Sequence, residues 1–203
     1  MGNAPRILFV TGTGTGVGKT IFAAALTAEL RSKGLRVAAL KPVCAGGRDD
    51  ARLARVAAGN VLTLDEVNPW HFRAALAPLL AARQERKQVR LREVVAHVRR
   101  VAKRFDVVVV EGAGGLLSPM GENFDSRDLI VALEARPVIV CPNKLGAINQ
   151  VLLVLAALPK KFARQAGVVL VEQPKPDRAS RTNRDLLAEK TGAERIVVLP
   201  CLV

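Results

Sequence analysis

The chain has 203 residues, of which 50% are hydrophobic and only 3% are aromatic, and it contains no tyrosine. This length suits one α/β domain, residues 1–203, with an aliphatic core that needs no disulfide or metal to hold it. No apolar run approaches the roughly 20 residues of a membrane span, and no signal-type segment precedes the first expected strand. We therefore expect a cytoplasmic protein that contacts no membrane. Three widely spaced cysteines argue against a disulfide framework or a cysteine metal cluster.

The net charge of +13 invites a nucleic-acid-binding function. However, nine Lys and Arg residues against two Glu are concentrated in residues 83–104. Apolar residues recur there at helical spacing: Leu91, Val94, Val95, Val98, Ala102 and Phe105. This pattern predicts an amphipathic helix whose basic side faces water. Because no aromatic residues are interleaved for base stacking, nucleic acid is an unlikely partner.

Residues 7–20, ILFVTGTGTGVGKT, predict a strand, a glycine-rich loop and the start of a helix. Such a loop turns its backbone N–H groups toward an anion, and Lys19 adds a charge that can reach the β- and γ-phosphates. The loop is one residue longer than the G-x-x-x-x-G-K-[ST] pattern, and Val17 replaces the third glycine of a dinucleotide fingerprint. We therefore expect a nucleoside triphosphate rather than NAD. The expected nucleotide-binding residues of the loop are Gly14, Gly16, Val17, Gly18, Lys19 and Thr20.

A helix over residues 21–33 should follow and end at Gly34. The next apolar run, residues 36–43, predicts a strand that places Lys41 at its carboxyl end, where open parallel sheets bind ligands. Lys41 is therefore a candidate anion-binding and catalytic residue. A loop then leads into a helix ending near residue 58, and either Asp49 or Asp50 could cap it.

The middle of the chain predicts connecting structure over residues 61–72 and a helix that begins near Arg73 and is interrupted by Pro78. His71 and His97 each lack a partner and are expected to be packed or solvated. Residues 105–110 predict a buried parallel strand ending at Glu111. A carboxylate in this position favours a metal ligand, with a structural ion pair as the alternative.

The remaining pattern alternates helices and strands. Helices are expected over 125–134 and 181–190, and strands over 137–141, 167–171 and 195–199. Residues 144–149, KLGAIN, are typical of a strand-to-helix turn whose free N–H groups could hold a carboxylate. Together the elements predict a doubly wound, mainly parallel sheet with helices on both faces, of the P-loop NTPase type.

Five motifs occur in one order along almost the whole chain: TGTGTGVGKT at 11–20, KPV at 41–43, NPxxF at 68–72, VEGAGG at 110–115 and KLGxIN at 144–149. In this order and spacing they resemble the dethiobiotin synthetases. The resemblance implies an ATP- and Mg²⁺-dependent cyclo-ligase of biotin biosynthesis. Its substrates would be the diamine 7,8-diaminopelargonate, CO2 or bicarbonate, and the nucleotide. A carbamate of one amine would attack the γ-phosphate, and the second amine would close the ureido ring.

The resemblance also implies roles for individual residues. Lys19, Lys41 and Thr15 would be catalytic, and the Mg²⁺ ligands would be Thr20, Asp50 and Glu111, with Asp49 as the alternate. The implied substrate-binding residues are Thr15, Lys41, Ala45, Gly114, Gly146, Ala147, Asn149 and Asn183. The protein would be a homodimer, with Asn183 contributing to the substrate-carboxylate pocket. Gly14 and Ala45 depart from the family, which often has an aspartate and a hydroxyl there.

Base recognition would fall to Glu172 and Gln173, which follow the strand expected at 167–171. Phosphate contacts are blind to the base, so we expect ATP and other nucleoside triphosphates to be used with preferences within about tenfold. A P-loop ATPase switch of the partitioning or regulatory type is the rival interpretation. Those proteins carry a second lysine early in the loop, which this sequence lacks.

Overall fold

A computed structural model describes residues 6–192 and 195–201 of the chain. Its centre is a six-stranded parallel sheet in the order β2-β5-β1-β6-β7-β8. The strands are β1 Arg6–Gly12, β2 Val37–Leu40, β5 Val107–Glu111, β6 Arg136–Asn143, β7 Gly167–Glu172 and β8 Ile196–Leu199. The predicted doubly wound α/β sheet is thereby confirmed.

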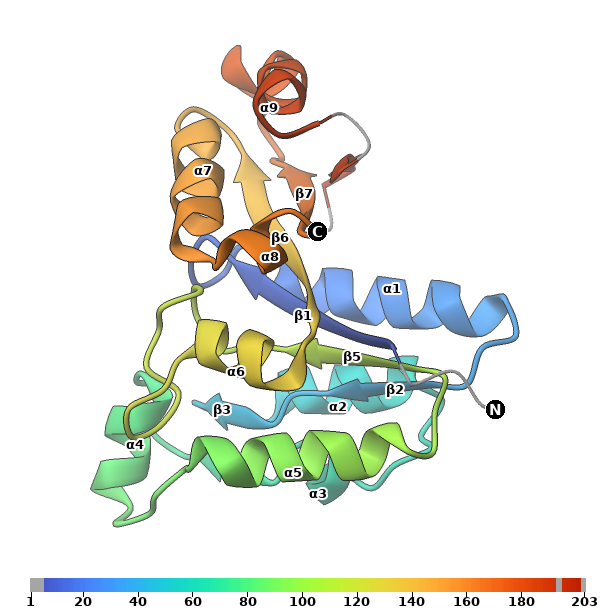
Figure 1. The fold of residues 1–203 in the computed structure, drawn as a ribbon, viewed down its shortest axis with the longest axis vertical. Helices are drawn as coiled ribbons and strands as arrows, with labels where there is room; N and C mark the ends of the chain where they lie inside the picture. Colours follow the sequence, from blue (N-terminus) through green and yellow to red (C-terminus); the bar gives the residue numbers. More distant parts are fainter. Residues whose placement is uncertain (1–5, 193–194, 202–203) are drawn as a thin grey trace.

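Helices cover both faces of this sheet because its buried strands are apolar on both sides. Along β1, Phe9 packs into the larger core cluster with residues of α5 and α6, and Val10 packs into a second cluster against α1. The helices are α1 Lys19–Ser32, α2 Asp49–Ala57, α3 Leu64–Val67, α4 Pro78–Gln84, α5 Leu91–Ala102, α6 Ser126–Leu133, α7 Ala147–Ala157, α8 Lys160–Ala163 and α9 Asn183–Thr191, with a short 3-10 turn η1 at Ala179–Arg181. Figure 1 shows α7 and α9 together at one end of the molecule and α4 and α5 at the other.

The predicted strand over residues 36–43 is in fact two strands in two sheets. β2 ends at Leu40, and β3 Val43–Ala45 pairs instead with β4 Trp70–Phe72 in a separate two-stranded parallel sheet. The break follows from Pro42, which has no N–H to continue a ladder. The Lys41 amide instead donates to the carbonyl of Val67 at 3.0 Å. Lys41 therefore stands at the point where the chain leaves the main sheet.

The prediction that a helix begins near Arg73 was wrong. The helix α4 begins at Pro78, which occupies its first turn. Proline suits that position because its missing N–H would have no partner inside the helix. Residues 61–72, expected as connecting structure, contain α3 with a capping box between Thr63 and Glu66, followed by β4.

Residues 91–102 of the basic segment form the amphipathic helix α5, as predicted, whereas residues 85–90 before them are not helical. Val94, Val98 and Val101 are buried against the sheet, and Arg92 and Lys103 lie in water. His97 is also buried, and its ring contacts the Glu66 carbonyl at 2.7 Å. In the described part of the chain, no helix is both long and apolar enough to cross a membrane.

Candidate functional site

The glycine-rich loop between β1 and α1 has the backbone that its sequence predicts. Gly16 and Gly18 have φ values of +71° and +95°, which L side chains rarely adopt. A Cβ on Gly12 would clash with the side chain of Val17, which is folded inward. The Lys19 ammonium donates to the Gly14 carbonyl at 2.7 Å, so its stem crosses the loop. The loop is therefore curled around a space that faces the α1 N-terminus, the arrangement that binds phosphate.

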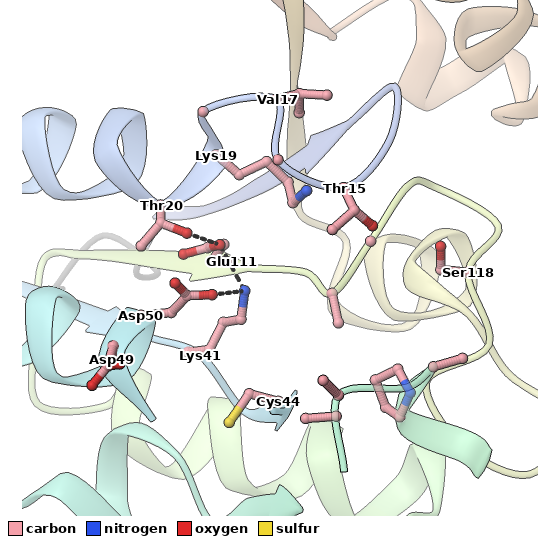
Figure 2. A pocket seen from close by; sticks show the side chains of 18 of the residues that line it. Thr15, Val17, Lys19, Thr20, Lys41, Cys44, Asp49, Asp50, Glu111 and Ser118 are labelled. Atoms are coloured by element: carbon pink, nitrogen blue, oxygen red, sulfur yellow. Dashed lines mark hydrogen bonds and ion pairs between the residues drawn. The ribbon is translucent and has the colours of Figure 1, made fainter. Parts of the chain in front are cut away.

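Four side chains meet beside this loop, and we call Thr20, Lys41, Asp50 and Glu111 the charged cluster. The Lys41 ammonium lies 2.6 Å from Glu111 Oε1 and 3.0 Å from Asp50 Oδ2. The Thr20 hydroxyl donates to the same Glu111 oxygen at 2.7 Å. Figure 2 shows the three interactions converging at the end of β5, with the Lys19 side chain above them. Residues from α1, β5 and α2 are thus brought together around the lysine that follows β2.

Burial and charge set the protonation of the two lysines. Burial alone would lower the pKa of Lys41, but the carboxylates of Glu111 and Asp50 outweigh it and raise this pKa above the ordinary value. Lys19 has no comparably close carboxylate, so burial, and then repulsion from Lys41, lower its pKa to about 8. Lys41 is a firmly held cation, and Lys19 is a cation that an incoming anion would stabilise.

Glu111 is only 2% exposed, and its second oxygen, Oε2, is buried with no hydrogen-bond partner among the described residues. A buried carboxylate oxygen without a partner is costly, so its presence points to a missing ligand. Asp50 shares the cluster, with its side chain 47% exposed. Asp49 turns away, is 92% exposed and pairs with Arg52 at 2.6 Å. Between the two aspartates, the geometry favours Asp50.

The charged cluster lies in a cleft of about 1040 Å³. Its lining includes these residues from the sequence prediction: Thr15, Gly16, Val17, Gly18, Lys19, Thr20, Lys41, Ala45, Asp49, Asp50, Glu111 and Gly114. The lining also includes apolar side chains, among them Leu53, Leu76 and Pro78. The cleft therefore combines charged groups suited to phosphates with apolar surface suited to an aliphatic chain.

Two residues that sequence reasoning passed over help to shape this cleft. Ser118 accepts a hydrogen bond from the Gly115 amide at 2.9 Å, and a Cβ on Gly114 would clash with it. Asn68, fully buried, donates to the Lys41 carbonyl at 2.7 Å and so fixes the chain where it leaves the sheet. Asn68 is the first residue of the NPxxF motif at 68–72, and this motif was the only sequence feature that could have indicated its importance.

A second polar group lies at the ends of β6 and β7, and we call Asn143, Glu172, Ser180 and Asn183 the amide network. Asn143 donates to Glu172 Oε1 at 2.7 Å and to the Ser180 carbonyl at 3.0 Å. Asn183 in turn donates to Asn143 Oδ1 at 2.9 Å and to the Lys144 carbonyl at 3.0 Å. Asn143, which the sequence analysis did not single out, is the centre of this network.

The predicted role of Asn183 in a substrate-carboxylate pocket does not fit this geometry. Its side chain is 2% exposed, and both amide hydrogens are used within the chain. Asn183 instead fastens the start of α9 to the end of β6. The structure also keeps Gly146, Ala147, Asn149, Glu172 and Gln173 out of the lining of the main cleft.

These last residues occupy two neighbouring places. Gly146, with φ of +91°, is the N-cap of α7, Ala147 is buried, and Asn149 is exposed. Glu172 is the last residue of β7, and Gln173, which follows it, donates to the Val171 carbonyl at 2.9 Å. Within one chain, the α7 start and the main cleft are separate surfaces.

The fold resembles that of solved structures. It matches a ParA family ATPase from Chlorobium tepidum with a TM-score of 0.59 and 17% identity, covering 97% of this chain and 85% of that one. It also matches the cell division protein FtsY from Thermotoga maritima with a TM-score of 0.54 and 18% identity, covering 96% and 62%. At such identities the likeness concerns the fold alone.

Sequence comparison is more specific. A family model described as an AAA domain matches residues 6–202. The ATP-dependent dethiobiotin synthetase BioD of Anaeromyxobacter dehalogenans is 40% identical over 200 residues, which cover 96% of this chain and 90% of the relative. The protein of the same name from Akkermansia muciniphila is 38% identical over 189 residues, covering 93% and 89%. With the phosphate loop, the two lysines and the glycine-rich turn after Glu111 in place, this chain belongs to the ATP-dependent dethiobiotin synthetase family.

Proposed function

We propose that this protein is an ATP-dependent ligase that closes the ureido ring of dethiobiotin from 7,8-diaminopelargonate and CO2. The observation that carries the proposal is the convergence of Lys19, Lys41 and Glu111 beside the phosphate loop, in a cleft that is also lined by apolar side chains. An aliphatic diamine needs both kinds of surface. The relatives from Anaeromyxobacter dehalogenans and Akkermansia muciniphila are named for this activity.

In this reaction the residues would contribute positioning and electrostatic stabilisation, and they would form no covalent bond with the substrate. Phosphoryl transfer places negative charge on the transferred group, and preorganised cations lower its cost. Lys19 and Lys41 approach that group from the loop and from the end of β2. Thr15 lines the cleft near Gly114, where a hydroxyl can orient the reacting amine and its carbamate. Ala45 contributes no hydrogen bond from its side chain.

Magnesium fits the donors of the charged cluster. A hard cation that bridges phosphates takes oxygen ligands, and Thr20, Asp50 and Glu111 present a hydroxyl and two carboxylates. Oε2 of Glu111 has no hydrogen-bond partner among the described residues and could serve as a ligand of the magnesium ion. The described residues hold no group of three or more His, Cys, Asp or Glu that would bind a metal by themselves, which suits an ion shared with phosphate. When bound, the ion would neutralise phosphate charge.

A homodimer would bring the start of α7 from one copy, with the predicted substrate-binding residues Gly146, Ala147 and Asn149, to the cleft of the other copy. Leu145 and Leu153, before and on α7, are 80% and 61% exposed, which leaves an apolar surface beside Gly146, Ala147 and Asn149. Pairing two copies there would bury this surface and set the free N–H groups of α7 in one copy near the cleft of the other. Sedimentation at micromolar concentration checks this, and a monomer would contradict it. The family's pocket would then form without the Asn183 side chain.

The activity is tested by mass spectrometry after incubation with the diamine, bicarbonate and MgATP. The expected product is dethiobiotin, formed in equal amount with ADP, and Lys19→Ala is the control that should lose both. ATP hydrolysis that proceeds without the diamine and yields no dethiobiotin would favour a P-loop switch instead. A cytoplasmic location and a single domain over residues 1–203 complete the proposal.

A further inference from the structure

Arg48, the residue before α2, directs its guanidinium toward the end of α3 and does not line the cleft. Its side chain is 17% exposed. Nε donates to Asn68 Oδ1 at 3.1 Å, and Nη2 donates to the carbonyls of Leu64 at 2.9 Å and Asn68 at 3.0 Å. Nη2 also reaches Oδ1 of the exposed Asp65 at 2.7 Å. Most of these acceptors are neutral, so the bonds hold the guanidinium in place more than they balance its charge.

Asn68 uses the two ends of its side-chain amide for two different parts of the site. Oδ1 accepts from Arg48, and Nδ2 donates to the Lys41 carbonyl at 2.7 Å. The Lys41 amide bonds to the neighbouring Val67 carbonyl at 3.0 Å. Asn68 is fully buried, and its amide cannot turn over, because its oxygen would then face the Lys41 carbonyl. Asn68 therefore links the chain at Arg48 to the chain at Lys41.

The first turn of α2 begins without a side-chain cap. Gly46 and Gly47 precede Arg48 with φ values of +86° and +130°, so they allow the chain to bend there but do not fix its direction. Asp50 follows two residues after Arg48, and its carboxylate lies 3.0 Å from the Lys41 ammonium. The hydrogen bonds of Arg48 therefore bear directly on where this turn, and with it the Asp50 carboxylate, lies relative to Lys41.

We propose that Arg48 is a positioning residue, which through Asn68 sets the place of the Asp50 carboxylate relative to the Lys41 ammonium. The inference rests on the magnesium site of the proposed function, in which Asp50 is a ligand. A cation shared with phosphates needs its carboxylate oxygens in a narrow range of positions. Loss of a residue that orients metal ligands commonly lowers metal affinity by about 10- to 100-fold. Because Arg48 does not line the cleft, it acts through Asp50 and Lys41.

Binding of Mn²⁺ tests the proposal without turnover. The metal is titrated in the presence of a non-hydrolysable ATP analogue and without the diamine, and electron paramagnetic resonance follows the bound ion. We expect Arg48→Ala to weaken Mn²⁺ binding at least about tenfold. Asp65→Asn, which changes only the exposed acceptor, should leave the affinity unchanged. Unchanged affinity in Arg48→Ala, or a wild-type protein that binds no Mn²⁺ under these conditions, would overturn the proposal.

Arg55→Ala is the matched control for a purely structural role. Arg55 lies in the last turn of α2 and also donates to a backbone carbonyl, that of Leu62, at 3.0 Å. Both variants lose a contact between an arginine of α2 and a carbonyl, so both should unfold at lower urea concentration. Only Arg48→Ala should bind Mn²⁺ weakly, because only Arg48 lies beside Asp50. Equal losses of Mn²⁺ affinity would show a general loosening of α2 and would contradict the proposal.

Arg48→Lys keeps the test decisive if Arg48→Ala fails to fold. Lysine retains the positive charge, but its ammonium cannot reproduce the planar fork that reaches Asn68 Oδ1 and the carbonyls together. This variant should therefore bind Mn²⁺ more weakly than the wild type and more tightly than Arg48→Ala. Wild-type affinity in Arg48→Lys would show that the fork has no positioning role.

The same titration separates this inference from the proposed function, since Mn²⁺ binding requires no ligase chemistry. Weak Mn²⁺ binding by Arg48→Ala, in a protein whose wild type forms no dethiobiotin, would remove the ligase proposal and leave this inference standing. Dethiobiotin formation by the wild type, with normal Mn²⁺ binding by Arg48→Ala, would remove only the inference.

Discussion

The charged cluster and the amide network each contain a glutamate at the end of a buried strand, and they compensate that glutamate in opposite ways. Glu111 is paired with the Lys41 ammonium at 2.6 Å and also accepts from Thr20. Glu172 accepts from the neutral amide of Asn143. The first arrangement balances charge with charge, and the second holds a carboxylate by hydrogen bonds alone.

The difference indicates what each site would accept. In the charged cluster, Lys41 occupies the position of a cation, and the free oxygen of Glu111 is suited to a further one. Lysine and metal cations that pair with carboxylates are common at phosphate-binding sites, where they also neutralise the charge of the phosphates. The amide network offers a fixed, uncompensated acceptor, which suits a neutral N–H donor. The two strand ends therefore differ in charge balance, with an ion pair at the end of β5 and an acceptor held by a neutral amide at the end of β7.

The largest expected effect comes from the lysines of the charged region. Lys41→Ala and Lys19→Ala should each reduce turnover at least about a hundredfold, since a preorganised charge on the transferred phosphoryl is worth roughly 3 kcal/mol or more. Steady-state product formation measures this. Near-normal turnover in either variant would remove that lysine from the mechanism.

Stability should separate the same two variants. Lys41 is only 4% exposed and balances the carboxylates of Glu111 and Asp50. Removing one partner of a buried ion pair costs roughly 3–5 kcal/mol, so Lys41→Ala should unfold at clearly lower urea concentration than Lys19→Ala. Equal midpoints would show that the ion pairs contribute little.

The metal requirement gives the next largest effect. Glu111→Gln and Asp50→Asn should raise the Mg²⁺ concentration for half-maximal activity by at least about tenfold, because an amide oxygen is a poorer ligand for a hard cation. Asp49→Asn is the matched control, since Asp49 pairs with Arg52 at the surface. A shifted titration in Asp49→Asn with none in Asp50→Asn would move the ligand back by one residue.

The amide network should show its role in stability. Asn183→Ala leaves Asn143 Oδ1 and the Lys144 carbonyl without their donor, and an unsatisfied buried polar group costs about 1–3 kcal/mol. Chemical unfolding measures this loss. The KM for the diamine should change little, because the side chain is used within the chain. A large rise in KM with unchanged stability would restore the substrate-binding role.

Sequence alone predicted the elements that follow from local pattern, and it failed where distant residues decide. Spacing and composition predicted the glycine-rich loop after β1 and the apolar face of α5. They also predicted that Lys41 lies at the end of a strand. Pro42 marks the break after Leu40, but the separate sheet that follows it could not be predicted, because β3 pairs with β4 and the Lys41 amide bonds to Val67, which lie about 25 residues later in the chain. Pro78 was ambiguous, since proline both interrupts helices and begins them.

The candidate site was predicted with the same limits. The motifs contained Thr20, Lys41 and Glu111 of the charged cluster. The choice between Asp49 and Asp50, which lie outside the motifs, needed the direction of the side chains at the start of α2. Asn183 was assigned to a substrate because its true partners, Asn143 and Lys144, lie about 40 residues earlier in the chain. The unpartnered oxygen of Glu172 could not be predicted from the sequence, because the burial of a single atom depends on the packing around the end of β7. The expected weak discrimination among bases stays a prediction.

The smallest effect is expected from Glu172→Gln in the nucleotide-free protein, and it tests whether the two glutamates differ in compensation. Glu111→Gln leaves the buried Lys41 with one anion fewer, so it should destabilise the fold. Glu172→Gln removes a buried charge that has no ion-pair partner in the described structure and keeps the acceptor for Asn143. Its free energy of unfolding should stay within about 1 kcal/mol of wild type, or rise, because an uncompensated charge costs more to bury than an amide. Urea unfolding of both variants at one pH makes the comparison. If Glu172→Gln destabilised as much as Glu111→Gln, the Glu172 carboxylate would be compensated after all, and the contrast between the two glutamates would fail.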